Sequence, residues 1–319
     1  MHWQRAKALQ AGDEVAVVLP SSAVRDAAAF ERGLDRLRGW GLHPTVLCEG
    51  RPNEGLDWPE GGAVAADDAA RKNALQQALR EPRFRAIFCG RGGYGAARLL
   101  GDLDWAPLRE DPKPIVGYSD ISALLSGAAR EAGMVGLHGP MVATTTAMDP
   151  GDDGWELQRR LLTEADLPTA LPAAGGARAL CSGVAEGALV GGNLAVLQGL
   201  LGTPWAPPTD GALLFLEDIG EAPYRVDRML TQLRQCGVLE RVAGVLLGDF
   251  HVEGTALASE HPGMGRVLEE RLGDLDVPVA CGLPFGHRPG AWTLPFGAQA
   301  RLVAEPGAVE VCLLEPCVR

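Results

Sequence analysis

The alternation of short apolar runs with longer amphipathic segments in the first half of the chain constrains the fold more than any other feature. Apolar residues recur at helical spacing in the longer segments, as Phe30, Leu34 and Leu37 do. The predicted helices lie at 26–40, 67–80, 94–100 and 120–132. The apolar runs are too short for helices and fit buried strands. These predicted strands lie at 15–19, 45–48, 85–89 and 114–117. Asp67 is placed to cap the second helix. This order predicts a parallel sheet with helices on both faces.

The second half of the chain has a mixed pattern. Between 151 and 178 the periodicity dissolves into a stretch rich in Asp, Gly, Pro and Ala, with one short helix near 155–162, and we interpret it as a linker. Beyond it, the pattern predicts strands at 188–190, 212–216 and 242–247, helices at 193–201 and 224–235, and a hairpin of 300–303 and 309–314. We therefore expect an α/β protein with an N-terminal parallel-sheet domain over residues 1–150 and a smaller C-terminal α+β domain over 179–319.

The net charge and the N-terminal sequence indicate which binding partners and which cellular compartment to expect. The net charge of −12 would repel a phosphate backbone or an anionic membrane, and the chain has no run of Lys and Arg, so we expect neither nucleic acid nor membrane as a partner. The apolar run at 15–19 is too short for a signal peptide and follows Asp13 and Glu14. Seven cysteines, without a C-x-x-C pair, suggest buried free thiols in a reducing compartment. These features predict a cytoplasmic protein.

A glycine-rich loop at 90–95 reads GRGGYG and matches G-x-G-x-x-G. One interpretation is a dinucleotide-binding loop, but that fingerprint belongs to the first strand–helix turn and this loop follows the third predicted strand. A second is a structural turn without a ligand. A third is an oxyanion hole, because glycines let backbone N–H groups approach an anion closely. The position of the loop favours the third interpretation.

Ser119 lies where a buried strand turns sharply into a helix, within the sequence Val116-Gly117-Tyr118-Ser119-Asp120-Ile121. A nucleophile elbow has this arrangement, because a strained turn projects Oγ above the sheet and the next N–H faces the oxyanion. The match to G-x-S-x-G is incomplete, since Ile121 replaces the last glycine. The alternative role for Ser119 is that of a helix N-cap.

A nucleophilic serine needs a base, and the chain offers six histidines. They are His2, His43, His138, His251, His261 and His287. His287 lies in a loop dense in Gly and Pro, at 282–290, which can hold a polar side chain rigidly. His138 lies just beyond a predicted strand, and His251 follows another.

Two carboxylates, Glu217 and Asp218, close the strongly apolar segment 213–216. Buried acids are costly unless something pairs with them. One interpretation makes Glu217 the partner of a base. The other pairs Glu217 with Arg225 or Arg228 and lets Asp218 cap the next turn.

Six segments of the chain together resemble the LD-carboxypeptidases, the muramoyl-tetrapeptide carboxypeptidases. They occur in the order found in that family and cover nearly the whole chain. The segments are 90–99 (GRGGYGAARL), 116–125 (VGYSDISALL), 138–141 (HGPM), 191–204 (GGNLAVLQGLLGTP), 214–233 (LFLEDIGEAPYRVDRMLTQL) and 282–297 (GLPFGHRPGAWTLPFG).

The resemblance implies a catalytic triad of Ser119 as nucleophile, Glu217 as acid and His287 as base, in a cleft between the two domains. It also implies oxyanion donors from the backbone of Gly92 or Gly93 and of Asp120. No metal or cofactor is implied. The substrate would be a cytoplasmic murein tetrapeptide that loses its terminal D-alanine during cell-wall recycling, and related enzymes form homodimers.

Two alternatives accompany this hypothesis. A second branch of the family, the microcin-immunity peptidases, uses the same triad on peptidyl-nucleotide analogues. A protein that binds a nucleotide through the loop at 90–95 without covalent chemistry is the other. If the chain is a carboxypeptidase, a group must hold the terminal carboxylate of the substrate, and Arg91 and Arg288 are candidates by position.

Overall fold

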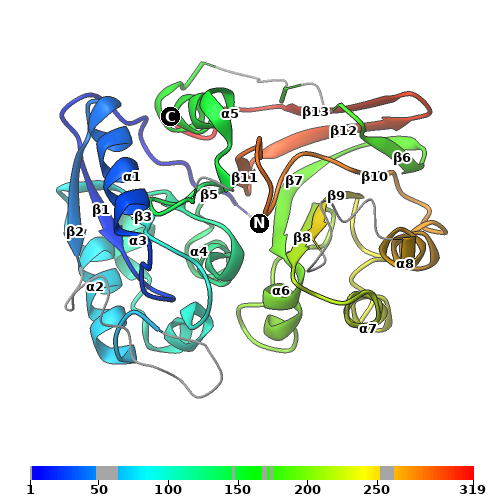
Figure 1. Cartoon of the computed structure of the whole chain (residues 1–319), viewed down its shortest axis with the longest axis horizontal. Helices are drawn as coiled ribbons and strands as arrows, with labels where there is room; N and C mark the ends of the chain where they lie inside the picture. Colours follow the sequence, from blue (N-terminus) through cyan, green and yellow to red (C-terminus); the bar gives the residue numbers. More distant parts are fainter. Residues whose placement is uncertain (1, 48–63, 146–147, 167–170, 173–174, 252–261) are drawn as a thin grey trace.

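The computed structural model describes residues 2–47, 64–145, 148–166, 171–172, 175–251 and 262–319. Two sheets form side by side, one mainly from each half of the chain (Figure 1). The first sheet has the order β11 (Leu294–Phe296), β5 (Gly136–His138), β4 (Ile115–Val116), β3 (Phe84–Cys89), β1 (Glu14–Val18) and β2 (His43–Leu47). All its pairs are parallel except β11 with β5, so the predicted parallel α/β sheet is confirmed.

The second sheet is mixed. Its order is β13 (Ala308–Leu313), β12 (Gln299–Glu305), β7 (Gly183–Asn193), β8 (Leu213–Ile219), β9 (Gly244–His251), β10 (Val279–Cys281) and β6 (Arg178–Cys181). The central strands β7 to β10 are parallel, and β6, β12 and β13 are antiparallel to their neighbours. The predicted hairpin at the end of the chain is confirmed as β12 and β13.

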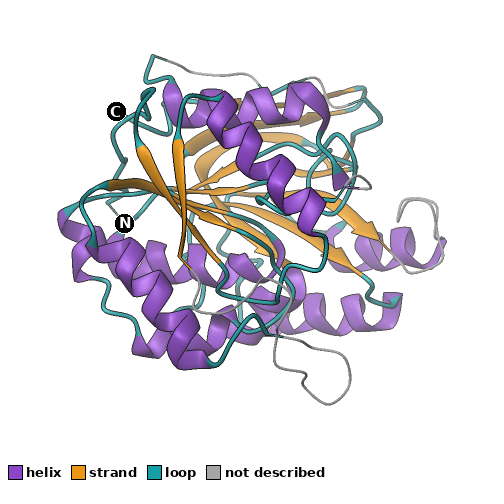
Figure 2. Cartoon of the chain, turned by 60° about the vertical axis from the view of Figure 1, so that its left-hand side comes forward, coloured by secondary structure: helices purple, strands orange, loops and turns teal. Residues whose placement is uncertain are grey.

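Helices lie on both sides of the strands (Figure 2). They are α1 (Ala27–Gly39), α2 (Asp68–Arg80), α3 (Ala106–Glu110), α4 (Ser122–Ala132), α5 (Gly151–Thr163), α6 (Leu194–Leu200), α7 (Pro223–Gln235) and α8 (Pro262–Leu272), with 3-10 helices η1 (Ala96–Asp102) and η2 (Ser119–Ile121). Asp67 caps α2 as predicted, because its carboxylate accepts a hydrogen bond from the Ala70 amide at 2.7 Å. Within the residues described, every helix is too short or too polar to cross a lipid bilayer.

One apolar core connects the two sheets. The large buried cluster contains residues of both halves, and the ring of Phe215 in β8 lies 6.2 Å from that of Phe296 in β11. A second cluster fills the space between α6, α7, α8 and their strands. Helix α5 occupies part of the segment interpreted as a linker and buries Leu157 and Leu161 in the large cluster. The domain boundaries at 150 and 179 stay a prediction.

The cysteine prediction needs one correction. Six of the cysteines lie in the described residues, and all are free thiols, with Cys89, Cys281 and Cys317 buried. Cys236 is exposed, because it follows the last residue of α7 at the surface. Cys48 lies outside the described residues.

Candidate active site

Ser119 lies at a strained bend between β4 and α4. It is the one non-glycine residue of the described chain with a positive φ, at 62°. Such a backbone costs about 1–3 kcal/mol for a residue with a Cβ, and it is typical of functional turns. A Cβ at Gly117 would lie 3.0 Å from side-chain atoms of Ile121, so the glycine makes room for the isoleucine. This contact explains how Ile121 can occupy the place of the last glycine in the elbow motif.

The glycine-rich loop lies against this bend. A Cβ built on Gly92 would lie 3.2 Å from Ser119 Oγ, so a side chain there would crowd the hydroxyl. Gly93 has φ of +109°, and its backbone packs on Ser22. The amides of Gly92 and Gly93 donate no hydrogen bond to any described residue, which leaves them free for a ligand. A 3-10 helix, η1, follows the loop, so the α-helical N-terminus of a dinucleotide site is missing there.

The Asp120 side chain has a structural role. It is buried, and its Oδ2 accepts hydrogen bonds from Ser21 Oγ at 2.7 Å and from the Ala96 amide at 2.8 Å. Burial raises the pKa of this carboxyl, while these hydrogen bonds lower it less. The carboxylate therefore ties two loops to the serine bend, and the backbone N–H of Asp120 is its candidate contribution to an oxyanion hole.

Glu217 and His287 form a buried acid–imidazole pair. His287 Nδ1 lies 2.7 Å from Glu217 Oε2, and the Glu217 side chain is 0% exposed. Gly286 makes this approach possible, because a Cβ there would lie 2.9 Å from Glu217 Oε2, and its φ is +98°. The alternative that pairs Glu217 with an arginine is wrong, since Glu217 pairs with His287 and Arg225 bonds to Glu221.

The charges of this pair support each other. Burial alone would raise the pKa of Glu217, but the neighbouring His287, His138 and Asn193 hold it below its usual value. Burial alone would lower the pKa of His287, but the charge and hydrogen bond of Glu217 raise it above 6.5 overall. Glu217 therefore stays ionised and stabilises the protonated form of His287.

Asp218, the residue after Glu217, has a structural role at the start of α6. Its Oδ2 accepts a hydrogen bond from the Ala195 amide at 2.9 Å, and its Oδ1 bonds to Asn193, which caps α6. Burial raises the pKa of Asp218 to about 7, with Glu217 adding to the effect. Asp218 also accepts a hydrogen bond from the Ile219 amide at 2.8 Å, and the helix end that it caps is that of α6, which precedes β8 in the chain.

The structure brings the base close to the serine bend. The ring of His287 lies 4.8 Å from that of Tyr118, the residue before Ser119. In the described chain, Ser119 Oγ forms no hydrogen bond to His287, a contact that often tightens only when substrate binds. A cavity of about 10 Å³ opens beside these residues, lined by both halves of the chain, with Tyr118, His138 and Trp292 among its walls.

The other histidines differ in position. His2 and His43 are exposed, and His261 and the side chain of His251 lie outside the described residues. His138 is buried in β5, with Nε2 3.8 Å from Glu217 Oε1. The sequence indicated His138 but no role for it, because its proximity to the acid arises from β5 and β8, which belong to different sheets.

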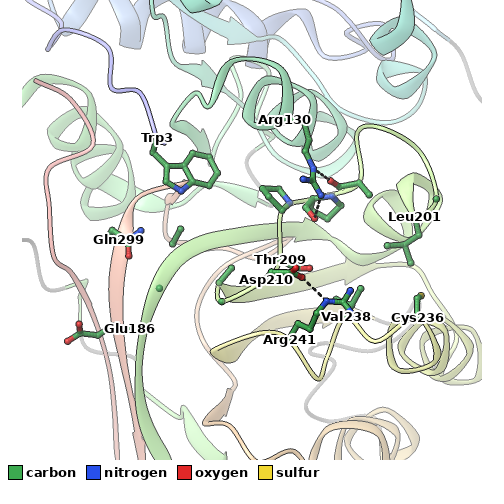
Figure 3. Close-up of a pocket in the computed structure, with 18 of the residues that line it drawn as sticks. Trp3, Arg130, Glu186, Leu201, Thr209, Asp210, Cys236, Val238, Arg241 and Gln299 are labelled. Carbon is green, nitrogen blue, oxygen red and sulfur yellow. Dashed lines mark hydrogen bonds and ion pairs between the residues drawn. The ribbon is translucent and has the colours of Figure 1, made fainter. Parts of the chain in front are cut away.

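A cavity of about 930 Å³ lies elsewhere, at the amino-terminal ends of β7 and β8 (Figure 3). Its walls include Trp3 and Thr209. Its cations are engaged already, because Arg130 donates to the carbonyls of 206 and 207 and Arg241 pairs with Asp210. Glu217 lies at the opposite, carboxyl end of β8, so this cavity is separate from the candidate active site. The described part of the chain also contains no group of three or more His, Cys, Asp or Glu arranged to hold a metal ion.

Known proteins are similar to this chain in sequence and in fold. The model of the LD-carboxypeptidase N-terminal domain matches residues 15–139, and that of the C-terminal domain matches residues 186–302. The murein tetrapeptide carboxypeptidase of Pseudomonas aeruginosa is 36% identical over 245 residues, which cover 73% of this chain and 76% of the relative.

Two groups of solved structures share the fold. The crystal structure of muramoyltetrapeptide carboxypeptidase from Oxalobacter formigenes is 28% identical, with a TM-score of 0.78 and coverage of 94% of this chain and 98% of that one. The microcin C7 self-immunity protein MccF has a TM-score of 0.85 at 22% identity and covers 99% of this chain and 100% of its own. At that identity the likeness shows the fold alone.

Proposed function

The chain belongs to the LD-carboxypeptidase family, and we propose that it is a serine carboxypeptidase that releases the terminal D-alanine of murein tetrapeptides. The bond cut would join an L centre to D-alanine, and the reaction would serve cytoplasmic cell-wall recycling. The observation that carries the proposal is the buried Glu217–His287 pair beside a serine with positive φ. The homodimer that the resemblance implies stays a prediction.

The proposed mechanism assigns one role to each of these residues. Glu217 accepts the Nδ1–H of His287 and thereby leaves Nε2 unprotonated and able to accept a proton. His287 takes the proton of Ser119 as Oγ attacks the carbonyl carbon, and it later protonates the leaving amine of D-alanine. The amides of Gly92 or Gly93 and of Asp120 stabilise the oxyanion. Water then hydrolyses the acyl-enzyme by the same base.

An activity assay with the purified protein tests this proposal directly. Incubated with murein tetrapeptide and with its all-L isomer, it should release D-alanine from the first and nothing from the second, as followed by mass spectrometry. A preference for an aminoacyl sulfamoyl nucleotide over the tetrapeptide would contradict the proposal and favour the microcin-immunity branch. The alternative of a nucleotide-binding protein would be favoured by two results together. A nucleotide would copurify and show in the absorption spectrum, and serine-directed reagents would not react with the protein.

A carboxypeptidase must also recognise a free carboxylate, and Arg91 is the better placed of the two candidates. It directly precedes Gly92, which lies against Ser119 Oγ. Its Nη1 donates to the carbonyl of Ala23 at 2.6 Å, and burial together with nearby Arg25 lowers its pKa. Among the described residues neither Arg91 nor Arg288 forms an ion pair with an acid, and the hydrogen bonds of both go to backbone carbonyls. A partly buried guanidinium beside another cation suits an anionic ligand.

Arg91→Gln is therefore expected to raise KM for the tetrapeptide about 10- to 100-fold, because a charge-assisted hydrogen bond contributes about 1.5–3 kcal/mol. For the C-terminal amide of the same peptide, the variant should change KM by no more than about threefold. Arg288→Gln is the parallel variant, and Arg159→Gln, whose guanidinium is held by Glu156 on α5, is the control. If the unchanged enzyme cuts the tetrapeptide and its amide equally well, no carboxylate clamp exists.

The pH dependence of activity should report on His287. The base acts only when neutral, and its pKa is raised above 6.5 by Glu217. Activity is therefore lost as pH falls through that raised pKa and is full above it, so kcat/KM should rise with pH along a limb whose midpoint exceeds 6.5. Steady-state kinetics between pH 5 and pH 9 check this, and a midpoint well below 6.5 would contradict the pairing.

A further inference from the structure

His138 is a buried histidine that the mechanism above does not use. It ends β5, where it pairs with Leu294 of β11, and it is 1% exposed. Its ring lies 5.2 Å from that of Phe215 and 6.0 Å from that of Tyr118, both at steep angles. Aromatic rings therefore hold this imidazole on two sides and limit how far it can turn.

The polar edge of this ring faces the acid. His138 Nε2 lies 3.8 Å from Glu217 Oε1, and both atoms are buried without a hydrogen-bond partner in the described chain. The other oxygen, Oε2, is occupied by His287. A buried polar atom without a partner costs about 1–3 kcal/mol, so two such atoms facing each other are each other's natural partners.

We propose that His138 is a positioning residue, whose neutral imidazole donates Nε2–H to Glu217 Oε1 and so holds the acid between two imidazoles. The inference rests on the proposed function of Glu217 and His287. A shift of about 0.8 Å brings the two atoms to hydrogen-bond distance, and the adjoining cavity of about 10 Å³ gives the ring room to tilt.

The surroundings of His138 keep it neutral. Burial lowers its pKa to about 4, with His287 adding to the effect and with Glu217 and a hydrogen bond to its own backbone opposing it. Tyr118 is the third titratable group that faces the ring, and burial raises its pKa, so its hydroxyl stays neutral. The two imidazoles on one carboxylate thus differ, because the pKa of His287 is raised and that of His138 is lowered.

This arrangement has a consequence for the base. A neutral donor on Oε1 disperses part of the charge of Glu217 and fixes its rotamer, so that Oε2 faces His287. Without that donor, the carboxylate would hold the imidazolium of His287 more strongly, and the pKa of His287 would rise. The acid limb of kcat/KM should then move to higher pH, which a merely structural role for His138 would not cause.

Two variants and one spectroscopic measurement test the proposal. His138→Phe keeps the ring packing and removes the donor. It should lower kcat/KM at pH 7 about 10- to 100-fold and move the acid limb upward by about half a unit to one unit. His138→Gln places an amide donor near the same position and should recover most of both losses. An unchanged limb in a folded His138→Phe variant would overturn the proposal.

The second arm needs no activity. In the unaltered protein with ¹⁵N-labelled histidine, NMR should show His138 as the neutral Nε2–H tautomer from pH 5 to pH 9, while His287 titrates. An Nδ1–H tautomer, or a His138 that titrates near 6.5, would refute it, even if the Phe variant does not fold. If the unaltered protein releases no D-alanine, the proposed function fails, while this measurement still decides the role of His138.

Discussion

Ser119→Ala is expected to lower kcat/KM by about 10⁴-fold or more while leaving the fold intact. The variant removes the nucleophile but keeps the glycine-rich loop and the Glu217–His287 pair, so only the catalysis by oxyanion donors and binding should survive. Release of D-alanine from murein tetrapeptide measures the loss, and circular dichroism checks the fold. Turnover near that of the unaltered enzyme in a folded variant would remove Ser119 from the mechanism.

Two further serine variants control this experiment. Ser119→Gly should be as inactive as Ser119→Ala. Its free energy of unfolding should exceed that of Ser119→Ala by up to about 1 kcal/mol, because glycine adopts a φ of 62° without a clash. Ser126 lies on α4, the helix that follows the bend at Ser119, and its Oγ donates to the carbonyl of Trp205 at 2.6 Å. Ser126→Ala should therefore lose some stability and retain activity, which separates the loss of a hydroxyl from the loss of this particular hydroxyl.

Much of the first sheet could be predicted because its strands are buried on both faces. Strands β1 and β3 are apolar over almost their whole length, and the helices between them keep a helical period. The predicted ends of these elements differ from the observed ends by a few residues. The segment predicted as a helix at 94–100 is a 3-10 helix that runs from 96 to 102. Gly95, with φ of +118°, directly precedes it and disfavours a regular start.

Strand β11 could not be predicted from local pattern. It is three residues long and includes Pro295, and it joins the sheet of the other half by pairing antiparallel with β5. The pairing depends on contacts between residues more than 150 positions apart, for which no local period exists. It also helps to bring the loop at 282–290 to the serine bend, so the architecture of the candidate site depends on the least predictable strand.

In the candidate site, too, local features could be predicted from the sequence and contacts between distant residues could not. The bend at Ser119 and the acids at the end of β8 are local features, and the sequence indicated both. The choice of His287 as the partner of Glu217, 70 residues away, came from the family resemblance and not from the residues themselves. His138 lacked even that signal, because its proximity to Glu217 arises from two strands in different sheets.

Glu217→Gln is expected to lower kcat/KM about 10³- to 10⁴-fold. The amide has nearly the shape of the carboxylate, but it can donate to Nδ1 and so stabilise the tautomer of His287 that carries its proton on Nε2. That tautomer cannot accept the proton of Ser119. The charge that raises the pKa of His287 is also lost, and burial then lowers this pKa. The residual activity should therefore show an acid limb at lower pH, opposite in direction to the shift expected for His138→Phe.

Asp218→Asn is the matched control for this variant, since it changes the adjacent carboxylate to an amide. Asp218 caps α6 through Asn193 and the Ala195 amide, and its pKa near 7 means that part of it is already uncharged at neutral pH. The control should lose about 1–2 kcal/mol of stability and stay within about tenfold of the original kcat/KM. If Glu217→Gln is no worse than Asp218→Asn, the chain has no functional acid at position 217, because a carboxylate that orients a base cannot be replaced by an amide without this loss.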